Sequence, residues 1–260
     1  MKIIQSILTK NPCYTAGKKI TVKGLMLHSV GCPQPSASVF IKNWNDAEYN
    51  RACVHAFIDG NTGNVHQTLP WNHRGWHGGG KCNDTHIGVE MCEPDCIKYT
   101  GGSTFTCTDK VTARAMVQRT YDTAVLLFAH LCKKYKLDPM KDIISHKEGS
   151  AKGIASNHGD PEHLWKQLGM GYTMNTFRKA VKAAMNGASN TASTNMSYLV
   201  RITADTLNVR KGVGTNHPIT AKVHRNEIYT IVGESTKGST KWGKLKSGAG
   251  WISLKYTQKI

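Results

Sequence analysis

The stretch Ile143-Ile-Ser-His146-Lys-Glu-Gly-Ser-Ala-Lys-Gly-Ile-Ala-Ser-Asn-His158-Gly-Asp160-Pro161 is the most informative part of this chain. An apolar run ends on His146, a loop that contains glycines follows, and Asp160 stands directly before a proline. Imidazole and carboxylate groups are common ligands of zinc. The stretch therefore predicts two ligands for one metal ion, with the loop returning the chain to the first of them.

His28 is the candidate for a third ligand, because it ends another apolar run, Gly24-Leu-Met-Leu-His28. Two imidazoles and one carboxylate make a common open zinc site, in which the fourth position is left for water. Taken singly, such a histidine is more often a hydrogen-bonded core or surface residue. The three residues together, each at a turn of the chain, favour a metal site.

His158 precedes Asp160 by two residues. The residue before a proline favours extended backbone, and residues i and i+2 of an extended segment share a face. We therefore expect His158 to point the same way as Asp160, where its imidazole can donate a hydrogen bond to an oxyanion that forms beside the metal. The alternative is a solvated loop histidine.

Glu90 lies in the apolar run Ile87-Gly-Val-Glu90-Met91. In a strand, residues 87, 89 and 91 share one face, and Gly88 and Glu90 share the other. A carboxylate on a sheet face beside a metal is partly desolvated, which raises its pKa toward that of a useful general base. The same pattern fits a solvated glutamate on a half-exposed strand equally well.

The chain of 260 residues carries a formal net charge of +17. A basic surface indicates an anionic partner, which can be nucleic acid, anionic lipid or an acidic cell wall. We find no aromatic RNA-binding motif, zinc finger or basic heptad helix, so no nucleic-acid partner is expected. No apolar run approaches the roughly 20 residues of a membrane span, so no membrane insertion is expected.

The first residues, Met1-Lys-Ile-Ile-Gln-Ser-Ile-Leu-Thr-Lys-Asn-Pro12, are too interrupted for a secretory signal, whose apolar core spans about 7–15 residues. We therefore expect synthesis in the cytoplasm without a signal peptide. Action outside the cell then requires release by another route.

All eight cysteines precede residue 133. For a chain made in the cytoplasm we expect reduced thiols, some of them in the core. The even number leaves disulfides as an alternative. A second metal site is a weaker one, because its candidates contain no CxxC pair. Those candidates are Cys82, Cys92, Cys96 and Cys107.

Residues 186–197, Asn-Gly-Ala-Ser-Asn-Thr-Ala-Ser-Thr-Asn-Met-Ser, are small and polar and predict a flexible linker. They separate a first domain, residues 1–185, from a second, residues 198–260. In the first, short apolar runs alternate with helical patterns, which predicts an α/β domain with one central sheet. In the second, short strands alternate with turns, which predicts a small β-barrel.

The expected elements follow from the apolar periodicity of each segment. In the first domain we expect strands at 24–29, 53–59, 65–69, 87–92 and 143–145, and helices at 109–135, 161–167 and 175–185. In the second we expect strands at 207–210, 227–232, 241–245 and 250–253.

Residues 20–170 resemble the zinc-dependent N-acetylmuramoyl-L-alanine amidases of the type 2, peptidoglycan-recognition-protein-like family. The resemblance rests on Leu25-Met-Leu-His28-Ser, Cys53-Val-His55-Ala-Phe-Ile-Asp59, Arg74-Gly-Trp76-His77-Gly-Gly, Asn83-Asp-Thr-His-Ile-Gly-Val-Glu90, Ser145-His146 and His158-Gly-Asp160-Pro161. It implies a mixed central sheet flanked by helices.

The resemblance also implies the roles of individual residues. It implies one zinc ion on His28, His146 and Asp160, and Glu90 as the general acid/base. His158 stands where many members carry a lysine that stabilises the oxyanion. Because a histidine loses its charge near neutrality, this departure leaves open how far that role extends to high pH. Two further residues, Trp76 and His77, are expected to line the substrate cleft.

Residues 199–257 resemble a bacterial Src-homology-3-like domain. The markers are Leu207-Asn-Val-Arg-Lys-Gly212, Trp242-Gly-Lys-Leu245 and Gly250-Trp-Ile252. Such domains commonly bind cell-wall peptide. The candidate wall contacts are aromatic, and packing in the barrel core is the expected role of at least two of them. They are Tyr229, Trp242, Trp251 and Tyr256.

These resemblances imply a peptidoglycan hydrolase that cleaves the amide bond between N-acetylmuramic acid and L-alanine by zinc-activated water. They predict a phage or prophage endolysin that acts on Gram-positive walls, reaches them through holin pores and lyses the cell or remodels its wall. One alternative is a wall-recognition protein without catalysis, although such relatives typically lack a metal ligand. The other alternative, a nucleic-acid binder, is favoured by charge alone.

Overall fold

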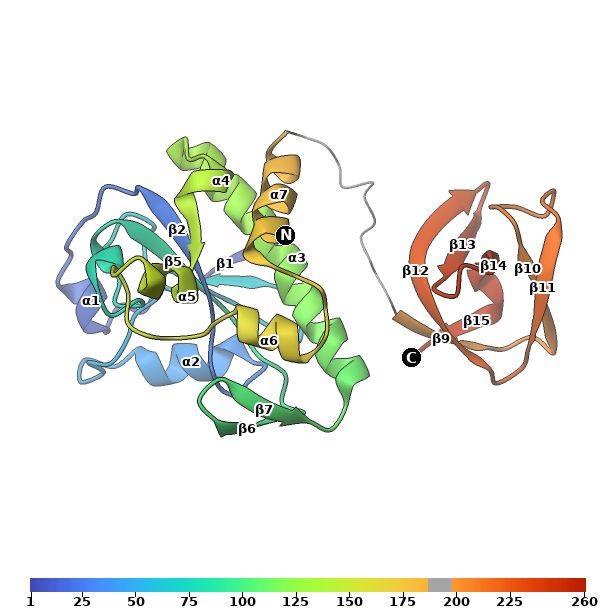
Figure 1. Ribbon diagram of the computed structural model, residues 1–260, viewed down its shortest axis with the longest axis horizontal. Coiled ribbons are helices and arrows are strands. Elements are labelled where there is room, and N and C mark those ends of the chain that lie inside the picture. Colours follow the sequence, from blue (N-terminus) through green and yellow to red (C-terminus); the bar gives the residue numbers. More distant parts are fainter. Residues whose placement is uncertain (187–197) are drawn as a thin grey trace. The chain divides into compact units, whose positions relative to one another are not determined.

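A computed structural model of the protein describes residues 1–186 and 198–260 (Figure 1). The chain divides into two compact units, residues 1–188 and 189–260. Except for Asn186, the predicted linker lies outside the described residues. Within the described residues, no helix is long and apolar enough to cross a membrane.

The N-terminal unit mixes strands and helices. Its strands are β1 (Ile3–Gln5), β2 (Gly24–Ser29), β3 (Ala56–Ile58), β4 (Val65–Gln67), β5 (His86–Met91), β6 (Ile97–Gly101), β7 (Thr104–Cys107) and β8 (Ile143–Ser145). Its α-helices are α1 (Pro12–Thr15), α2 (Ala37–Trp44), α3 (Lys110–Tyr135), α4 (Pro139–Asp142), α5 (His146–Ala151), α6 (Glu162–Gln167) and α7 (Met174–Met185). The predicted α/β class is confirmed.

Six strands form the central sheet, in the order β1-β4-β3-β5-β2-β8. The neighbours β3, β5, β2 and β8 run parallel to one another, whereas β4 is antiparallel to β3. The register pairs His28 of β2 with Glu90 of β5. The hairpin β6–β7 is separate from this sheet.

The core lies mainly between the sheet and α3. Alternate residues of β2, such as Leu25 and Leu27, are fully buried on the face of the sheet that packs against α3. Burying each aliphatic side chain contributes about 1.5–3 kcal/mol. Asp109 begins α3 by accepting hydrogen bonds from two free backbone amides, those of Val111 and Thr112. The intervening residues of β2 therefore face the opposite side of the sheet, and His28 is one of them.

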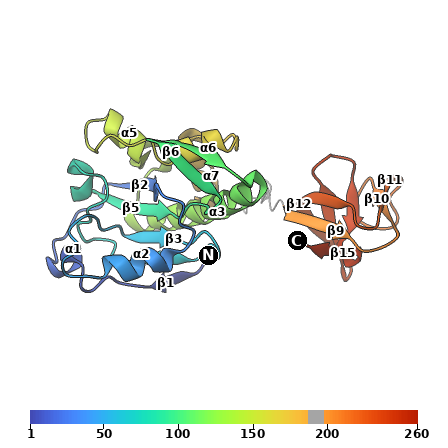
Figure 2. The same cartoon turned by 90° about the horizontal axis from the view of Figure 1, so that it is seen from below.

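The helices α5 and α6 lie at one end of the N-terminal unit, and α1 and α2 lie at the other (Figure 2). Phe40 of α2 stacks on Phe57 of β3, with ring centroids 4.9 Å apart. Helix α2 thus covers part of the face that α3 leaves open. His28 and Glu90, near the carboxyl ends of β2 and β5, point to this face. In open α/β sheets, ligands bind beyond the carboxyl ends of the strands.

The C-terminal unit is all β, as expected. Its strands are β9 (Tyr198–Ile202), β10 (Thr206–Arg210), β11 (Ile219–His224), β12 (Ile228–Lys237), β13 (Thr240–Leu245), β14 (Trp251–Ser253) and β15 (Thr257–Lys259). They form one sheet in the order β11-β10-β14-β13-β12-β9-β15. In the described part of the chain β11 pairs with β10 and β15 pairs with β9, so both remain edge strands. The described strands therefore form an open sheet, and the small β-barrel predicted from the sequence is not formed.

Candidate metal centre

His28, His146 and Asp160 meet at one buried point of the N-terminal unit. Each offers one ligand atom, and these atoms all lie within 4.8 Å of one another. The two Nδ1 atoms are 3.1 Å apart. An Asp160 carboxylate oxygen lies 3.3 Å from Nδ1 of His28 and the other 3.5 Å from Nδ1 of His146. Among the described residues this is the only cluster with metal-binding geometry.

The parallel strands bring these residues together. His28 lies near the carboxyl end of β2, and His146 follows β8 as the first residue of α5. Ser145 caps that helix, since its hydroxyl accepts from the amide of Glu148. Asp160 lies at the end of the returning loop, where its carboxylate accepts a hydrogen bond of 3.3 Å from the amide of Ser29.

His77 determines the tautomer of His28. Nε2 of His77 is 3.0 Å from the carbonyl oxygen of His86, which can only accept, so Nε2 carries the proton and Nδ1 does not. Nδ1 of His77 therefore accepts from Nε2 of His28, 3.0 Å away. As a consequence, the Nδ1 atom of neutral His28 carries a free lone pair that faces Asp160.

His146 has the same arrangement on its outer side. Its Nε2 atom is 3.1 Å from the hydroxyl of Ser156, and that hydroxyl donates to the carbonyl oxygen of Gly78. The Ser156 oxygen is then the acceptor for Nε2–H of His146. The Nδ1 atom of His146 is left unprotonated, facing Nδ1 of His28.

The donor set fits a divalent metal ion. Two imidazole lone pairs at 3.1 Å repel each other unless a cation lies beside both. Burial, and next the nearby His28, lower the pKa of His146 to about 4, which keeps it neutral. Burial alone would raise the pKa of Asp160, but the neighbouring imidazoles of His28 and His146 lower it overall.

Glu90 points to the same face as its register partner His28. Its Oε2 atom is buried and has no hydrogen-bond partner among the described residues. Burial raises its pKa well above the ordinary range, and the negative charges of Asp160 and Glu93 raise it further. The Glu90 carboxylate is therefore desolvated, and is not a solvated group on a half-exposed strand.

His77 lies behind His28, although the sequence predicted it in the substrate cleft. It is only 9% exposed, and its backbone amide donates to Asn83. A Cβ atom on Gly88 would lie 2.4 Å from the ring of His77, so the glycine makes room for the imidazole. Trp76 is 45% exposed, which leaves its ring free for a ligand.

His158 is exposed and lies beside His146, with ring centroids 4.4 Å apart. Its Nδ1 atom is 3.0 Å from the hydroxyl of Ser156, which also contacts His146. One hydroxyl thus joins both imidazoles. Its Nε2 atom has no hydrogen-bond partner among the described residues.

Sequence reasoning missed Glu93, a fully buried carboxylate beyond the end of β5. It accepts hydrogen bonds from the amide of Gly31 at 3.1 Å and from the hydroxyl of Tyr99 at 2.7 Å. Burial raises its pKa to about 7. A signal was present, because Glu93 precedes a proline, as Asp160 does.

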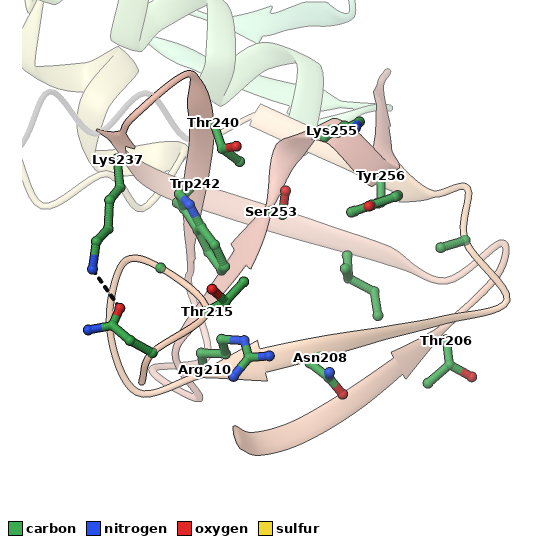
Figure 3. A pocket seen from close by; sticks show the side chains of 14 residues that line it. Thr206, Asn208, Arg210, Thr215, Lys237, Thr240, Trp242, Ser253, Lys255 and Tyr256 are labelled. Atoms are coloured by element: carbon green, nitrogen blue, oxygen red, sulfur yellow. Dashed lines mark hydrogen bonds between the residues drawn. The ribbon is translucent and has the colours of Figure 1, made fainter. Parts of the chain in front are cut away.

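The candidate wall contacts in the C-terminal unit divide into two pairs. Trp242 and Tyr256 line a pocket of about 750 Å³ (Figure 3), whereas Tyr229 and Trp251 do not. Tyr229 packs against the core of this unit, and its hydroxyl donates to Glu227. Trp251 is half-buried and pairs with Lys244 and Arg210 on adjacent strands.

All eight cysteines are free thiols. Four of them are buried, namely Cys53, Cys82, Cys92 and Cys132. Among the described residues they form no metal-binding cluster, so the second metal site considered from the sequence has no geometric support.

The chain is similar to proteins of known structure. A Staphylococcus aureus hydrolase, AmiA, solved in complex with its ligand, is 19% identical, with a TM-score of 0.55 over 72% of this chain and 86% of that one. A mutant endolysin from Bacillus subtilis is 20% identical, with a TM-score of 0.46 over 70% of this chain and 99% of that one. No curated protein matches this chain.

The family model described as N-acetylmuramoyl-L-alanine amidase matches residues 18–163. That range contains the buried cluster of His28, His146 and Asp160, and also Glu90 and His158. It covers more than half of the chain. The chain therefore belongs to the N-acetylmuramoyl-L-alanine amidase family, a family of enzymes.

Proposed function

We propose that this protein hydrolyses the amide bond between N-acetylmuramic acid and L-alanine in peptidoglycan, with one zinc ion bound by His28, His146 and Asp160. The observation that carries the proposal is the pair of Nδ1 atoms, 3.1 Å apart, beside a buried carboxylate. This donor set, two imidazoles and one carboxylate, is common in catalytic zinc sites that keep a position for water.

A zinc ion bound there would lower the pKa of a water molecule to about 7 and polarise the substrate carbonyl. Within the protein, Glu90 moves the proton. Its unpartnered Oε2 atom takes a proton from the attacking water and then gives it to the leaving amine. A carboxylate with a raised pKa suits both steps, because it binds the proton in the first and releases it in the second.

His158 stabilises the charge that develops on the substrate carbonyl oxygen. Its exposed ring lies beside His146, and in the protonated imidazole, whose Nδ1–H donates to Ser156, Nε2–H is the donor available to a ligand. The exposed ring of Trp76 contributes contact area for the sugar or peptide next to the cleaved bond. In this proposal His77 orients His28 and does not contact the substrate.

The C-terminal unit, in this proposal, is a Src-homology-3-like wall-binding domain. The pocket that contains Trp242 and Tyr256 is the surface by which it binds. Tethering this unit to the catalytic unit raises the effective concentration of enzyme at the wall. The biological role we propose is that of a phage or prophage endolysin that lyses Gram-positive cells after release through holin pores.

Product analysis tests the reaction. The purified full-length protein is incubated with peptidoglycan, and new L-alanine N-termini and new reducing sugar ends are both measured. We expect L-alanine N-termini alone, loss of the reaction with a chelator and its return with added zinc. New reducing ends would instead show cleavage of the glycan, and an undiminished reaction in chelator would exclude the metal.

A further inference from the structure

The pocket of the C-terminal unit has a charge that its wall-binding aromatics do not explain. Strands β10, β12 and β13, a loop near residue 215 and the segment before β15 contribute to its lining. Three of the lining residues are cations, and none is acidic. The cations are Arg210, Lys237 and Lys255. In the view of Figure 3, Lys237 lies at one end of the pocket and Lys255 toward the other.

These cations bond to neutral groups. An Nη atom of Arg210 donates to the carbonyl oxygen of His217 at 2.8 Å, and Nζ of Lys237 donates to the side-chain oxygen of Asn216 at 2.5 Å. Nζ of Lys255 lies 5.9 Å from the ring centroid of Tyr256. None of these partners carries a negative charge, so the pocket keeps all three positive charges.

The acidic residues of this unit are engaged elsewhere. Residues 198–260 contain three of them, and none lines the pocket. Asp205 pairs with Arg225 at 2.7 Å. Glu227 accepts from the amide of His224 at 2.6 Å, and Glu234 accepts from the hydroxyl of Tyr198 at 2.7 Å. No described side chain of the unit therefore neutralises the pocket.

The rest of the lining suits a polar ligand that also has apolar surface. The ring of Trp242 is buried in the wall, whereas Tyr256 is 45% exposed. Hydroxyl and amide side chains surround them and can bond sugar hydroxyls or peptide amides. These are Thr206, Asn208, Thr215, Asn216, Thr240 and Ser253.

We propose that this pocket binds an anionic segment of the cell wall, through carboxylate or phosphate groups that contact Arg210, Lys237 and Lys255. Guanidinium and ammonium groups form their strongest hydrogen bonds with these two anions. Several cations in one pocket favour a segment with more than one anionic group. The choice of the wall as the source of the anion rests on the proposed function, whereas the selection of an anion rests on the pocket itself.

Binding of two soluble probes to the full-length protein tests this inference. The probes are labelled polyphosphate and labelled poly-L-glutamate, measured at physiological salt. The pocket variant Arg210→Gln/Lys237→Gln/Lys255→Gln is compared with the control Lys222→Gln/Lys244→Gln/Lys246→Gln, which loses the same charge at exposed sites outside the pocket. We expect the pocket variant to bind about tenfold more weakly, since it loses charge-assisted hydrogen bonds. The control should lose much less, because exposed charges are screened.

The two probes distinguish the source of the anion. Binding of polyphosphate alone would assign phosphate groups, and binding of poly-L-glutamate alone would assign carboxylates; either supports the inference. Equal weakening in both variants, or no binding of either probe by the unchanged protein, would overturn it. The double variant Lys237→Gln/Lys255→Gln, which leaves Arg210 and its hydrogen bond intact, repeats the comparison should the triple variant misfold.

Hydrolysis is measured separately on a small soluble muropeptide. The control variant Lys222→Gln/Lys244→Gln/Lys246→Gln should cleave it at the unchanged rate, because its substituted residues lie outside both the pocket and the catalytic unit. Loss of probe binding by the pocket variant supports the inference even where no amide is cleaved. Amide cleavage with unchanged probe binding would leave the proposed function standing and remove the inference alone.

Discussion

The candidate metal centre and the cationic pocket arrange their polar groups in opposite ways. At the metal centre the donors are buried, and each imidazole is bonded on its outer side to a group that fixes its proton. In the pocket the charged ends of Lys237 and Lys255 are exposed and bond to neutral partners or to none. The first arrangement is rigid before a ligand arrives, and the second can adjust to it.

This difference suits the two proposed ligands, a metal ion and an anionic polymer. A small ion with fixed coordination gains from donors that are already oriented, because little order is lost on binding. A flexible polymer presents its anionic groups at variable spacing, which long cationic side chains can follow. We therefore expect single substitutions to have large effects at the metal centre and small effects in the pocket, where charges act together.

Removal of a ligand should give the largest effect. Asp160→Ala takes away the only carboxylate between two imidazoles, and we expect at least about 100-fold weaker zinc binding and no measurable amidase activity. Zinc titration with a competing chelator, together with circular dichroism to confirm folding, provides the measurement. If folded Asp160→Ala protein still bound one zinc ion tightly, single substitutions would not have the large effect expected at the metal centre.

Glu90→Gln should separate proton transfer from metal binding. It retains the shape of the side chain but not the titrating oxygen, so activity should fall by about 10²–10⁴-fold while zinc content is unchanged. In the unchanged enzyme, a base must be deprotonated, so activity should fall as the pH decreases through the raised pKa of Glu90. An enzyme that keeps full activity after this substitution has another base.

We expect His77 to affect zinc binding, because it orients His28. His77→Ala removes the acceptor that fixes the tautomer of His28, and we expect about 10–100-fold weaker zinc affinity. His77→Gln can still accept from His28 and should lose less. Zinc affinity is the readout, since a residue that only fills space would change stability without this difference. Equal zinc affinity in both variants would show that His77 acts by packing alone.

The smallest expected effect concerns stability and pH. The pKa of Glu93, raised to about 7, lies above its ordinary value of 4.5, so the folded state binds the proton more tightly. The resulting stabilisation is complete below about pH 4.5 and is lost as the pH rises through about 7, with a limit of about 3 kcal/mol. Denaturant unfolding of Glu93→Gln and unchanged protein at both ends of this range should show a flatter dependence for the variant. Parallel curves would refute the assignment.

Sequence reasoning located the cluster but not its surroundings. His28, His146 and Asp160 each end an apolar run or precede a proline, and these local signals predicted that they converge. The role of His77 depends on two features of β5, the backbone carbonyl of His86 and the missing side chain of Gly88. Residue type and local pattern carry no information about such contacts.

The helices and strands likewise divide into those that the sequence predicted and those that it did not. Strands β2 and β8 begin and end where the apolar pattern predicted, because both are buried on both faces. The hairpin β6–β7 was not predicted, since its strands are short, largely exposed and polar. In the C-terminal unit the sequence predicted several of the turns. It did not predict the pocket, because the cations of the pocket come from separate segments that only strand pairing brings together.

Gly88 has a consequence for how this site can change over generations. Because a Cβ atom there would overlap the ring of His77, the two positions are not independent. A lineage that acquires a larger residue at position 88 must also replace His77 by a residue with a smaller side chain. That replacement removes the acceptor for Nε2 of His28. We expect related proteins either to keep both Gly88 and His77 or to replace both.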